Sequence, residues 1–224
     1  MERGGEDGGA GYDARPFVPA EADLGELREA AAGCHGCPLY REATQTVFGA
    51  GNPSARVVLV GEQPGDVEDR RGLPFVGPAG RVLTRALEEA GIDPDDSYIT
   101  NAVKHFKFVQ QGRGKRRIHK APSLREMAAC RPWLAEELRL IAPEVVVALG
   151  ATAGKSLLGP DFRVTRERGT PLPLAPLDGA REPTDVVCVA TIHPSAVLRA
   201  DDRDAVYAGL VSDLRVVAGA LRAP

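Results

Sequence analysis

No segment of the sequence is long and apolar enough to cross a lipid bilayer, and the N-terminus has no apolar stretch typical of a secretory signal. We therefore expect the protein in the cytoplasm. A net positive charge is also lacking, since the formal charge is −3 and the isoelectric point is about 5.9. Attraction to phosphate decays over a Debye length of about 8–10 Å, so any contact with nucleic acid requires a local basic patch.

Cysteine is scarce. Four cysteines occur among 224 residues, and in a cytoplasmic protein they argue against a disulfide framework and raise metal ligation as an alternative. Cys188 falls within the apolar run 186–190, so we expect it to be a buried core thiol. Cys34 and Cys37 form a CxxC pair, a spacing that can place two thiolates on one metal centre.

Two further residues are candidates for the same metal centre. Cys130 lies far along the chain on a predicted amphipathic helix. His105 is our candidate for a fourth ligand, because it lies at a strand exit beside Asn101. The spacing alone leaves zinc and an iron–sulfur cluster both open, and it also leaves open that these thiols are unrelated.

Short β-branched runs alternate with segments of helical spacing along the chain. The expected strands are 56–60, 98–101, 145–149 and 186–191. The expected helices are 24–32, a segment after Gly80, 124–140, 152–158 and 204–221. This alternation predicts an α/β fold: a single three-layer domain whose central, mostly parallel four-stranded sheet is covered by helices on both faces.

Three segments show no such periodicity. Residues 1–15 are rich in glycine and charge and are expected to form a disordered tail, which leaves 16–224 as the single domain. Residues 106–122 are expected to form a long basic loop. The proline-rich stretch 171–183 is expected to be a surface connection.

Ligands of parallel α/β sheets bind at the carboxyl ends of the strands. The GEQPG motif (61–65), Asn101 and the HPSA motif (193–196) each follow or end a predicted strand, so we expect the site there. The segment 150–156 resembles a phosphate-binding P-loop, but only three residues separate its glycines where four are required. A plain strand-to-helix turn is therefore favoured. Gly77 and Gly80 before a helix are a weak signal whose amides could hold one phosphate.

Several motifs in a consistent order carry a resemblance to a known family. They are GEQPG (61–65), GLPFVGPAG (72–80), NAVKHF (101–106), KRRIH (115–119), CRPW (130–133) and HPSA (193–196). This set resembles the iron–sulfur uracil-DNA glycosylases, and within them the type X branch, which carries the KRRIH loop and becomes covalently linked to DNA. The resemblance covers nearly all of the chain beyond the N-terminal tail.

The resemblance implies a structural 4Fe-4S cluster held by Cys34, Cys37, His105 and Cys130. Related glycosylases usually have cysteine where His105 stands here. The cluster would tie the N-terminal helix to the basic segment, and iron–sulfur is therefore expected over zinc.

The resemblance also implies a pocket for an extruded uracil. Cleavage of the glycosidic bond leaves an oxocarbenium-like sugar and a uracil anion, so donors near uracil O2 lower the barrier. Asn101 would pair with the uracil edge, Phe75 would stack on the base, and His193 would donate to O2. Gln63 and the loop backbone around it, including Gly61, would complete the pocket.

His119 of the KRRIH motif is the candidate nucleophile, because a neutral imidazole is available near neutral pH. It would capture the sugar cation at C1′ and leave DNA attached to the protein. Glu62 would hydrogen-bond the other ring nitrogen and take its proton after the attack. Asp66 would position a water molecule or the loop, or would only cap local structure.

The expected partner is uracil-containing DNA, preferably single-stranded, with free uracil as product, no membrane contact and a monomeric protein. The chain would then associate with the bacterial nucleoid through DNA. The residues expected to contact DNA are Lys115, Arg116, Arg117, Lys120, Ser195 and Arg199. Two alternatives stay open: a glycosylase with ordinary turnover in which His119 only binds DNA, and a non-catalytic module that recognises uracil or abasic DNA.

Overall fold

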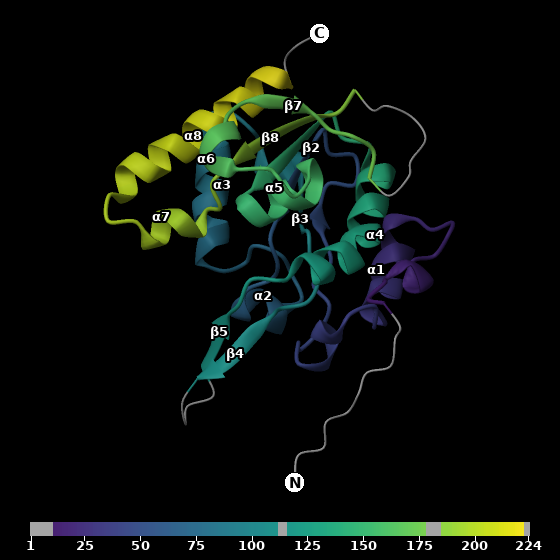
Figure 1. The fold of residues 1–224 in the computed structure, drawn as a ribbon. Coiled ribbons are helices and arrows are strands. Elements are labelled where there is room, and N and C mark those ends of the chain that lie inside the picture. The colour runs from purple at the N-terminus through teal and green to yellow at the C-terminus, as the bar shows by residue number, and fades with distance from the viewer. Residues whose placement is uncertain (1–10, 112–115, 178–184, 222–224) are drawn as a thin grey trace.

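The computed structural model describes residues 11–111, 116–177 and 185–221. A six-stranded sheet in the order β1-β3-β2-β6-β8-β7 forms the centre of the molecule, and helices cover both of its faces (Figure 1). Its strands are β1 (Ala50–Gly51), β2 (Val57–Gly61), β3 (Ser97–Asn101), β6 (Val145–Leu149), β7 (Pro171–Pro173) and β8 (Val187–Thr191). A separate two-stranded hairpin consists of β4 (Phe108–Gln111) and β5 (Arg116–His119).

The helices are α1 (Leu24–Ala32), α2 (Asp66–Arg71), α3 (Pro78–Ala90), α4 (Leu124–Ile141), α5 (Ala151–Leu158), α6 (Val164–Glu167), α7 (Ser195–Arg199) and α8 (Arg203–Ala220). Short 3-10 turns occupy Arg15–Phe17, Pro38–Arg41 and Pro94–Asp96. Among these described helices, none is long and apolar enough to span a membrane.

The four central strands β3, β2, β6 and β8 run parallel, which confirms the predicted core of the sheet. Every residue of β2 and β6 is buried, as expected for strands covered on both faces. The sequence did not predict the edge strands β1 and β7, which are antiparallel and only two and three residues long. Because β7 lies within the segment 171–183, the first three residues of that expected surface connection belong to the sheet instead. Proline is tolerated there because an edge strand needs fewer backbone donors.

The sheet separates two hydrophobic cores. Side chains of α3, α7 and α8 pack on one face, together with Leu59 and Val147. Side chains of α4 and α5 pack on the other face, together with Val58 and Cys188. The predicted burial of Cys188 is thus confirmed, because its side chain is fully inaccessible. A third cluster, formed by α1, α4 and the segment that follows α1, contains the other three cysteines.

The basic segment 106–122 is the main correction to the expected fold. It forms the β4–β5 hairpin, with Phe108 opposite His119 and Gln110 opposite Arg117. Charged residues interrupt its polar–apolar alternation, and its stabilising contacts come from residues more than 40 positions away in the sequence, so local patterns predicted a loop. The hairpin projects away from the central sheet (Figure 1). Lys115 lies outside the described residues.

Residues 11–15, which were expected to belong to the disordered tail, are described by the structure and contact the rest of the chain. Residues 1–10 lie outside the described part, but the amide of Asp13 donates to the carbonyl of Gly36 and the amide of Ala14 donates to the carbonyl of Ala129. Ala14 is buried against the third hydrophobic cluster. These two hydrogen bonds fix the segment before α1 to both the CxxC loop and α4.

A buried ion pair joins α4 to the end of β3. The ammonium of Lys104 contacts the carboxylate of Glu137, and both side chains are almost fully inaccessible. Lys104 Nζ also donates to Thr100 Oγ1 at 2.7 Å and to the carbonyl of Asn101 at 2.9 Å. Glu137 accepts further hydrogen bonds from the hydroxyl of Tyr98 and the amide of Gly49. The network therefore fixes the position of the backbone at Asn101.

Replacing Glu137 by glutamine should lower the free energy of unfolding by about 3–5 kcal/mol, because the buried Lys104 cation would lose its counter-ion. The double replacement Lys104→Met/Glu137→Leu removes both charges and should be less destabilising than the single one. Urea unfolding monitored by circular dichroism measures both variants. A single variant as stable as the unmodified protein would show that the ion pair contributes nothing.

Candidate active site

The carboxyl ends of β2, β3 and β8 bring three predicted site residues to one edge of the sheet. Asn101 ends β3, Glu62 follows β2, and His193 follows β8. The hairpin adds His119, whose Nε2 lies 3.1 Å from Glu62 Oε1. The Phe75 ring lies with its centroid 5.8 Å from that of His193. These five side chains come from separate parts of the sequence, and the fold gathers them as predicted.

The side-chain oxygen of Asn101 is buried, yet within the described part of the chain it accepts no hydrogen bond. An unmet buried acceptor costs about 1–3 kcal/mol, so a ligand that donates to it gains binding energy. Gly61 lets Asn101 and Phe75 pack closely against its backbone, because a Cβ at this position would meet Asn101 Oδ1 and approach the Phe75 ring to 2.7 Å. Phe75 itself has a positive φ of 53°, which is rare for a bulky residue. The rare conformation and the missing partner together point to a binding pocket.

His193 is held as a neutral hydrogen-bond donor. Its Nδ1 accepts from the backbone amide of Ser195 at 3.2 Å and contacts the Ser195 hydroxyl at 2.8 Å. Because an amide can only donate, the ring proton must sit on Nε2. Burial lowers the pKa of His193 to about 4, which keeps the ring uncharged. Arg199 in turn donates to Ser195 Oγ at 3.0 Å, so two residues expected to contact DNA orient the histidine.

Glu62 is ionised and lies between two histidines. Burial alone would raise the pKa of Glu62, but hydrogen bonds from His119 and Thr152 outweigh burial and bring the pKa below its usual value. His119 is half exposed, and its Nδ1 makes no hydrogen bond with the described residues. The sequence did not indicate Thr152, which lies near the start of α5, in the segment that resembles a P-loop but is one residue too short.

Gln63 was expected to line the pocket, but its side chain is engaged with the hairpin instead. Its Nε2 donates to the carbonyls of Lys107 and Lys120 at 3.0 and 3.2 Å. Its Oε1 accepts from the amide of Lys107 at 3.1 Å. Since Lys107 precedes β4 and Lys120 follows β5, one amide group joins the two ends of the hairpin. Gln63 therefore holds the segment that carries His119.

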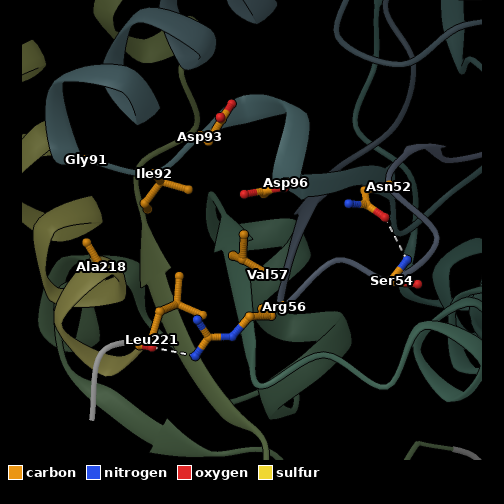
Figure 2. Close-up of a pocket in the computed structure, with 10 residues that line it drawn as sticks. All are labelled: Asn52, Ser54, Arg56, Val57, Gly91, Ile92, Asp93, Asp96, Ala218 and Leu221. Carbon is orange, nitrogen blue, oxygen red and sulfur yellow. Dashed lines mark hydrogen bonds between the residues drawn. The ribbon is translucent and has the colours of Figure 1, made fainter.

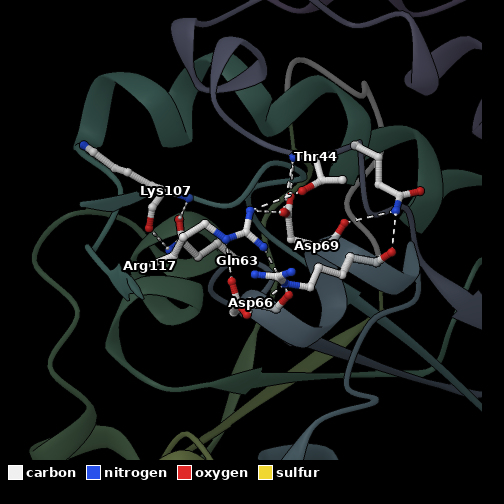
Figure 3. Close-up of polar contacts among 8 residues, drawn as sticks. Thr44, Gln63, Asp66, Asp69, Lys107 and Arg117 are labelled. Atoms are coloured by element: carbon white, nitrogen blue, oxygen red, sulfur yellow. Dashed lines mark hydrogen bonds and ion pairs between the residues drawn. The ribbon is translucent and has the colours of Figure 1, made fainter. Parts of the chain in front are cut away.

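Arg117 was expected to contact DNA phosphates, but its guanidinium points into the protein (Figure 3). It donates to Asp66 Oδ1 at 2.5 Å and to Asp69 Oδ2 at 2.6 Å, and its side chain is only 9% exposed. The rings of Phe106 and Phe108 lie 5.4 and 5.0 Å from the guanidinium carbon. Because Asp66 pairs with Arg117 of β5, the geometry favours positioning of the loop over positioning of water or capping of local structure.

Asp69 is the second carboxylate that binds Arg117, and the sequence did not indicate this role. It is fully buried and also accepts from the amide of Thr44 at 2.9 Å. It lies three residues after Asp66 on α2, and residues three apart share a helix face. That spacing could have suggested a shared cationic partner. In contrast, Arg116 and Lys120 are exposed and stay available for DNA contact.

The predicted metal ligands lie in the third hydrophobic cluster. Cys34, Cys37 and Cys130 are all buried there, and burial raises the pKa of the Cys37 thiol and raises that of Cys130 to about 12. The indole of Trp133 donates to Cys34 Sγ at 3.2 Å, and the amide of Lys104 donates to Cys130 Sγ at 3.3 Å. Donors aimed at sulfur are suited to thiolates, which such a buried site forms only with a metal.

His105 is oriented as a ligand would be. The Thr46 hydroxyl donates its one proton to the carbonyl of Ala31, so it must accept from Nε2–H of His105 at 2.9 Å. The lone pair is then on Nδ1. Burial lowers the pKa of His105 to about 4, so the ring is neutral, as a metal ligand must be. In the described ranges, however, no three His, Cys, Asp or Glu side chains are arranged to hold a single metal ion.

Two features outside this group of side chains resemble ligand sites: the start of α3 and a pocket at the other end of β2. The amide of Gly77 at the start of α3 donates to Glu68 Oε1 at 2.8 Å. A carboxylate of the protein therefore already uses the amide that could have held a phosphate. A pocket of about 310 Å³ is lined by Asn52, Arg56, Asp93 and Leu221, among others (Figure 2). Val57 in its wall begins β2 whereas Glu62 follows the end of β2, so this pocket lies at the opposite edge of the sheet.

The fold and the site define a class: an α/β protein that gathers a buried, unpartnered amide oxygen, a carboxylate and two histidines at the carboxyl edge of its parallel sheet. Residues 48–215 match the uracil DNA glycosylase superfamily. The chain belongs to this superfamily, which confirms the resemblance found in the sequence. It is 40% identical over 167 residues to the type-4 uracil-DNA glycosylase of Thermotoga maritima, covering 74% of this chain and 78% of the relative. It is 34% identical over 177 residues to the type-4 enzyme of Pyrobaculum aerophilum, covering 79% and 85%.

Replacing Gly61 by alanine should slow uracil release by roughly a hundredfold, because the added methyl group meets the side chains of Asn101 and Phe75 and shifts both away from the base. Some loss of stability is expected, since overpacking costs about 1–3 kcal/mol. Release of uracil from a labelled oligonucleotide measures the effect. Gly219→Ala is the matched control, because a Cβ there meets no atom within 4 Å. Equal rates for both variants would mean that Gly61 does not border the base.

Proposed function

We propose that this protein excises uracil from DNA and becomes covalently linked to the resulting abasic site through His119, as a type X member of its superfamily. The observation that carries this proposal is the contact of 3.1 Å between His119 Nε2 and Glu62 Oε1 at the carboxyl edge of the sheet. A phosphate bound at His119 would lie beside the ionised Glu62 and be repelled by it, so this pair does not favour a role limited to phosphate binding. The 40% identity to a type-4 uracil-DNA glycosylase supports the excision step.

The pocket would recognise uracil through its edge and its face. Asn101 Oδ1, which has no donor in the described structure, would accept from the N3–H of uracil. The ring of Phe75 would stack on the extruded base, a contact of about 1–3 kcal/mol. His193 Nε2–H would donate to O2, where negative charge develops as the glycosidic bond breaks. A neutral donor suits this task, because it need not change its protonation state.

The adduct would form in two steps, departure of uracil and capture of the sugar by His119. The glycosidic electron pair leaves with uracil N1, and the sugar becomes an oxocarbenium ion. The free ring nitrogen of His119 donates its lone pair to C1′, and Glu62 accepts the proton from the other ring nitrogen. The product is an uncharged N-alkyl imidazole. Its reversal would require an imidazolate anion to leave, which explains why the bond would persist.

The hairpin would hold the nucleophile in place. Gln63 joins the two ends of the hairpin, and Arg117 anchors β5 to α2 through Asp66 and Asp69. His119 lies two residues after Arg117 on the same strand, so its side chain lies on the same face of the hairpin. We therefore assign Gln63, Asp66 and Arg117 to positioning His119 rather than to contact with uracil or phosphate.

A 4Fe-4S cluster held by Cys34, Cys37, Cys130 and Nδ1 of His105 would support the site structurally. The cluster would supply four ligand bonds that join the segment after α1, the segment after β3 and α4. Thiols with a pKa raised by burial, the donors aimed at two of the sulfurs and the fixed tautomer of His105 fit this donor set. A cluster is wider than one ion, which agrees with the lack of a close single-ion site in the described residues.

Incubation with a uracil-containing single strand followed by a heated denaturing gel should give a protein–DNA band of reduced mobility. His119→Ser should abolish this band and allow repeated turnover, because water would then capture the sugar cation. Glu62→Gln should give slower capture or a more labile adduct. Free uracil without a shifted band in the unmodified protein would favour ordinary turnover instead, and neither product would favour a non-catalytic binder.

The purified protein should be coloured and contain about four irons per chain if the cluster is present. Cys130→Ser should lose iron and stability, whereas His105→Cys should retain both, because a thiolate also ligates iron. Cys188→Ser is the matched control, since Cys188 lies in a different core. Iron and zinc analysis measures the outcome, and one zinc per chain without iron would contradict the cluster.

Single-stranded DNA as the preferred substrate and a monomeric protein stay predictions. The same holds for a cytoplasmic location with association to the nucleoid. A shifted band on single-stranded but not on duplex substrate in the gel assay would support the first of these.

A further inference from the structure

A shallow groove with a volume of about 490 Å³ lies between the end of α2 and one face of α3. Its lining includes Arg71 from α2, Phe75, and Gly80 together with four polar residues of α3. The polar α3 residues are Arg81, Thr84, Arg85 and Glu88. We call this surface the arginine groove.

The arginine groove is strongly cationic on a chain that is acidic overall. Three arginines against one glutamate give a local charge of +2, whereas the whole chain carries −3. The side chains of Arg71, Arg81 and Arg85 are exposed. Exposed like charges at i and i+4 on a helix repel each other, so Arg81 and Arg85 do not stabilise α3.

These arginines also lack the partners that arginines elsewhere on the surface have. Arg56 pairs with Glu144 and Arg139 with Glu136. By contrast, the guanidinium groups of Arg71 and Arg81 form no ion pair or hydrogen bond with the described residues. Arg85 makes a cation–π contact, with its guanidinium carbon 4.9 Å from the ring centroid of Tyr207. Three guanidinium groups are thus free to take an anionic ligand.

The arginine groove adjoins the candidate active site through Phe75. This residue lines the groove, and its ring also lies close to Gly61 and to His193. A nucleotide whose base stacks on Phe75 would therefore have its own sugar and phosphate near the end of the groove. Arg81 and Arg85 lie one helical turn apart, about 6 Å along α3, which suits successive anionic groups of an extended strand.

Resting on the function proposed above, we propose that the arginine groove binds the phosphodiester backbone of the DNA strand next to the extruded uridine. Arg71, Arg81 and Arg85 supply the cations, and the Thr84 hydroxyl supplies a further donor. This surface is separate from the exposed cations of the hairpin, Arg116 and Lys120, because α2 and α3 form it. Phosphate contacts of this kind fix the register of the strand without reading its sequence.

The test measures the affinity of the full chain for a single strand that carries one 2′-fluoro-deoxyuridine, whose glycosidic bond resists cleavage. Arg81→Gln/Arg85→Gln should reduce the slope of log K against log salt by about 1.4, since each phosphate contact on a single strand contributes about 0.7. The corresponding loss of affinity is roughly 25-fold at 0.1 M salt. With cleavable substrate at saturation, the rate of uracil release should not change.

Arg139→Gln/Arg166→Gln is the matched control, because it removes two exposed charges from α4 and α6. Its affinity should stay close to that of the unmodified protein; an equal loss would indicate a general charge effect and overturn the proposal. Replacing single phosphates by uncharged methylphosphonates should identify linkages at which the unmodified protein loses affinity and the Arg81/Arg85 variant does not. If the unmodified protein releases uracil but the Arg81/Arg85 variant keeps its affinity and salt slope, the arginine groove is not a DNA site. Failure of the unmodified protein to release uracil would instead overturn the proposed function.

Discussion

The site depends on how the β4–β5 hairpin is held over the end of β2. Arg117 is the central element, because its guanidinium joins β5 to two carboxylates of α2. One of these, Asp69, is fully buried, and a buried carboxylate without its cation is strongly unfavourable. The hairpin therefore cannot move away without exposing Asp69 to solvent or leaving it unpaired. The position of His119, two residues further along β5, follows from this constraint.

A single short segment after β2 serves three purposes at once. Gly61 allows the close approach of Asn101, Glu62 contacts His119, and Gln63 joins the two ends of the hairpin. Because these residues are consecutive, the glycine beside Asn101, the carboxylate and the amide that holds the hairpin share one short stretch of backbone. A shift of this segment would alter the pocket and the position of His119 together. Such coupling is consistent with a reaction in which departure of the base and capture of the sugar must follow each other closely.

The sequence predicted the parallel strands because uninterrupted valine-rich runs such as 57–60 and 145–147 are typical only of strands covered on both faces. It also predicted that polar side chains gather at the carboxyl edge, because parallel strands end at the same edge of the sheet. It could not predict the partners of Gln63 and Arg117, which lie 44 to 57 positions away and are set by tertiary structure. A run of basic residues in sequence looks like a surface for phosphate, yet alternate residues of a strand point to opposite sides. Arg117 accordingly faces inward while Arg116 faces solvent.

The predicted metal centre and the hairpin anchor are connected through the segment 44–46. Thr46 fixes the tautomer of His105 by accepting from its Nε2–H, and two residues earlier the amide of Thr44 donates to Asp69. Arg117 also donates to the Thr44 hydroxyl at 3.2 Å. A change in the position of His105 would thus be transmitted along three residues to the carboxylate that holds Arg117. A metal centre held by His105 would therefore stabilise the segment against which the hairpin, and with it His119, is held.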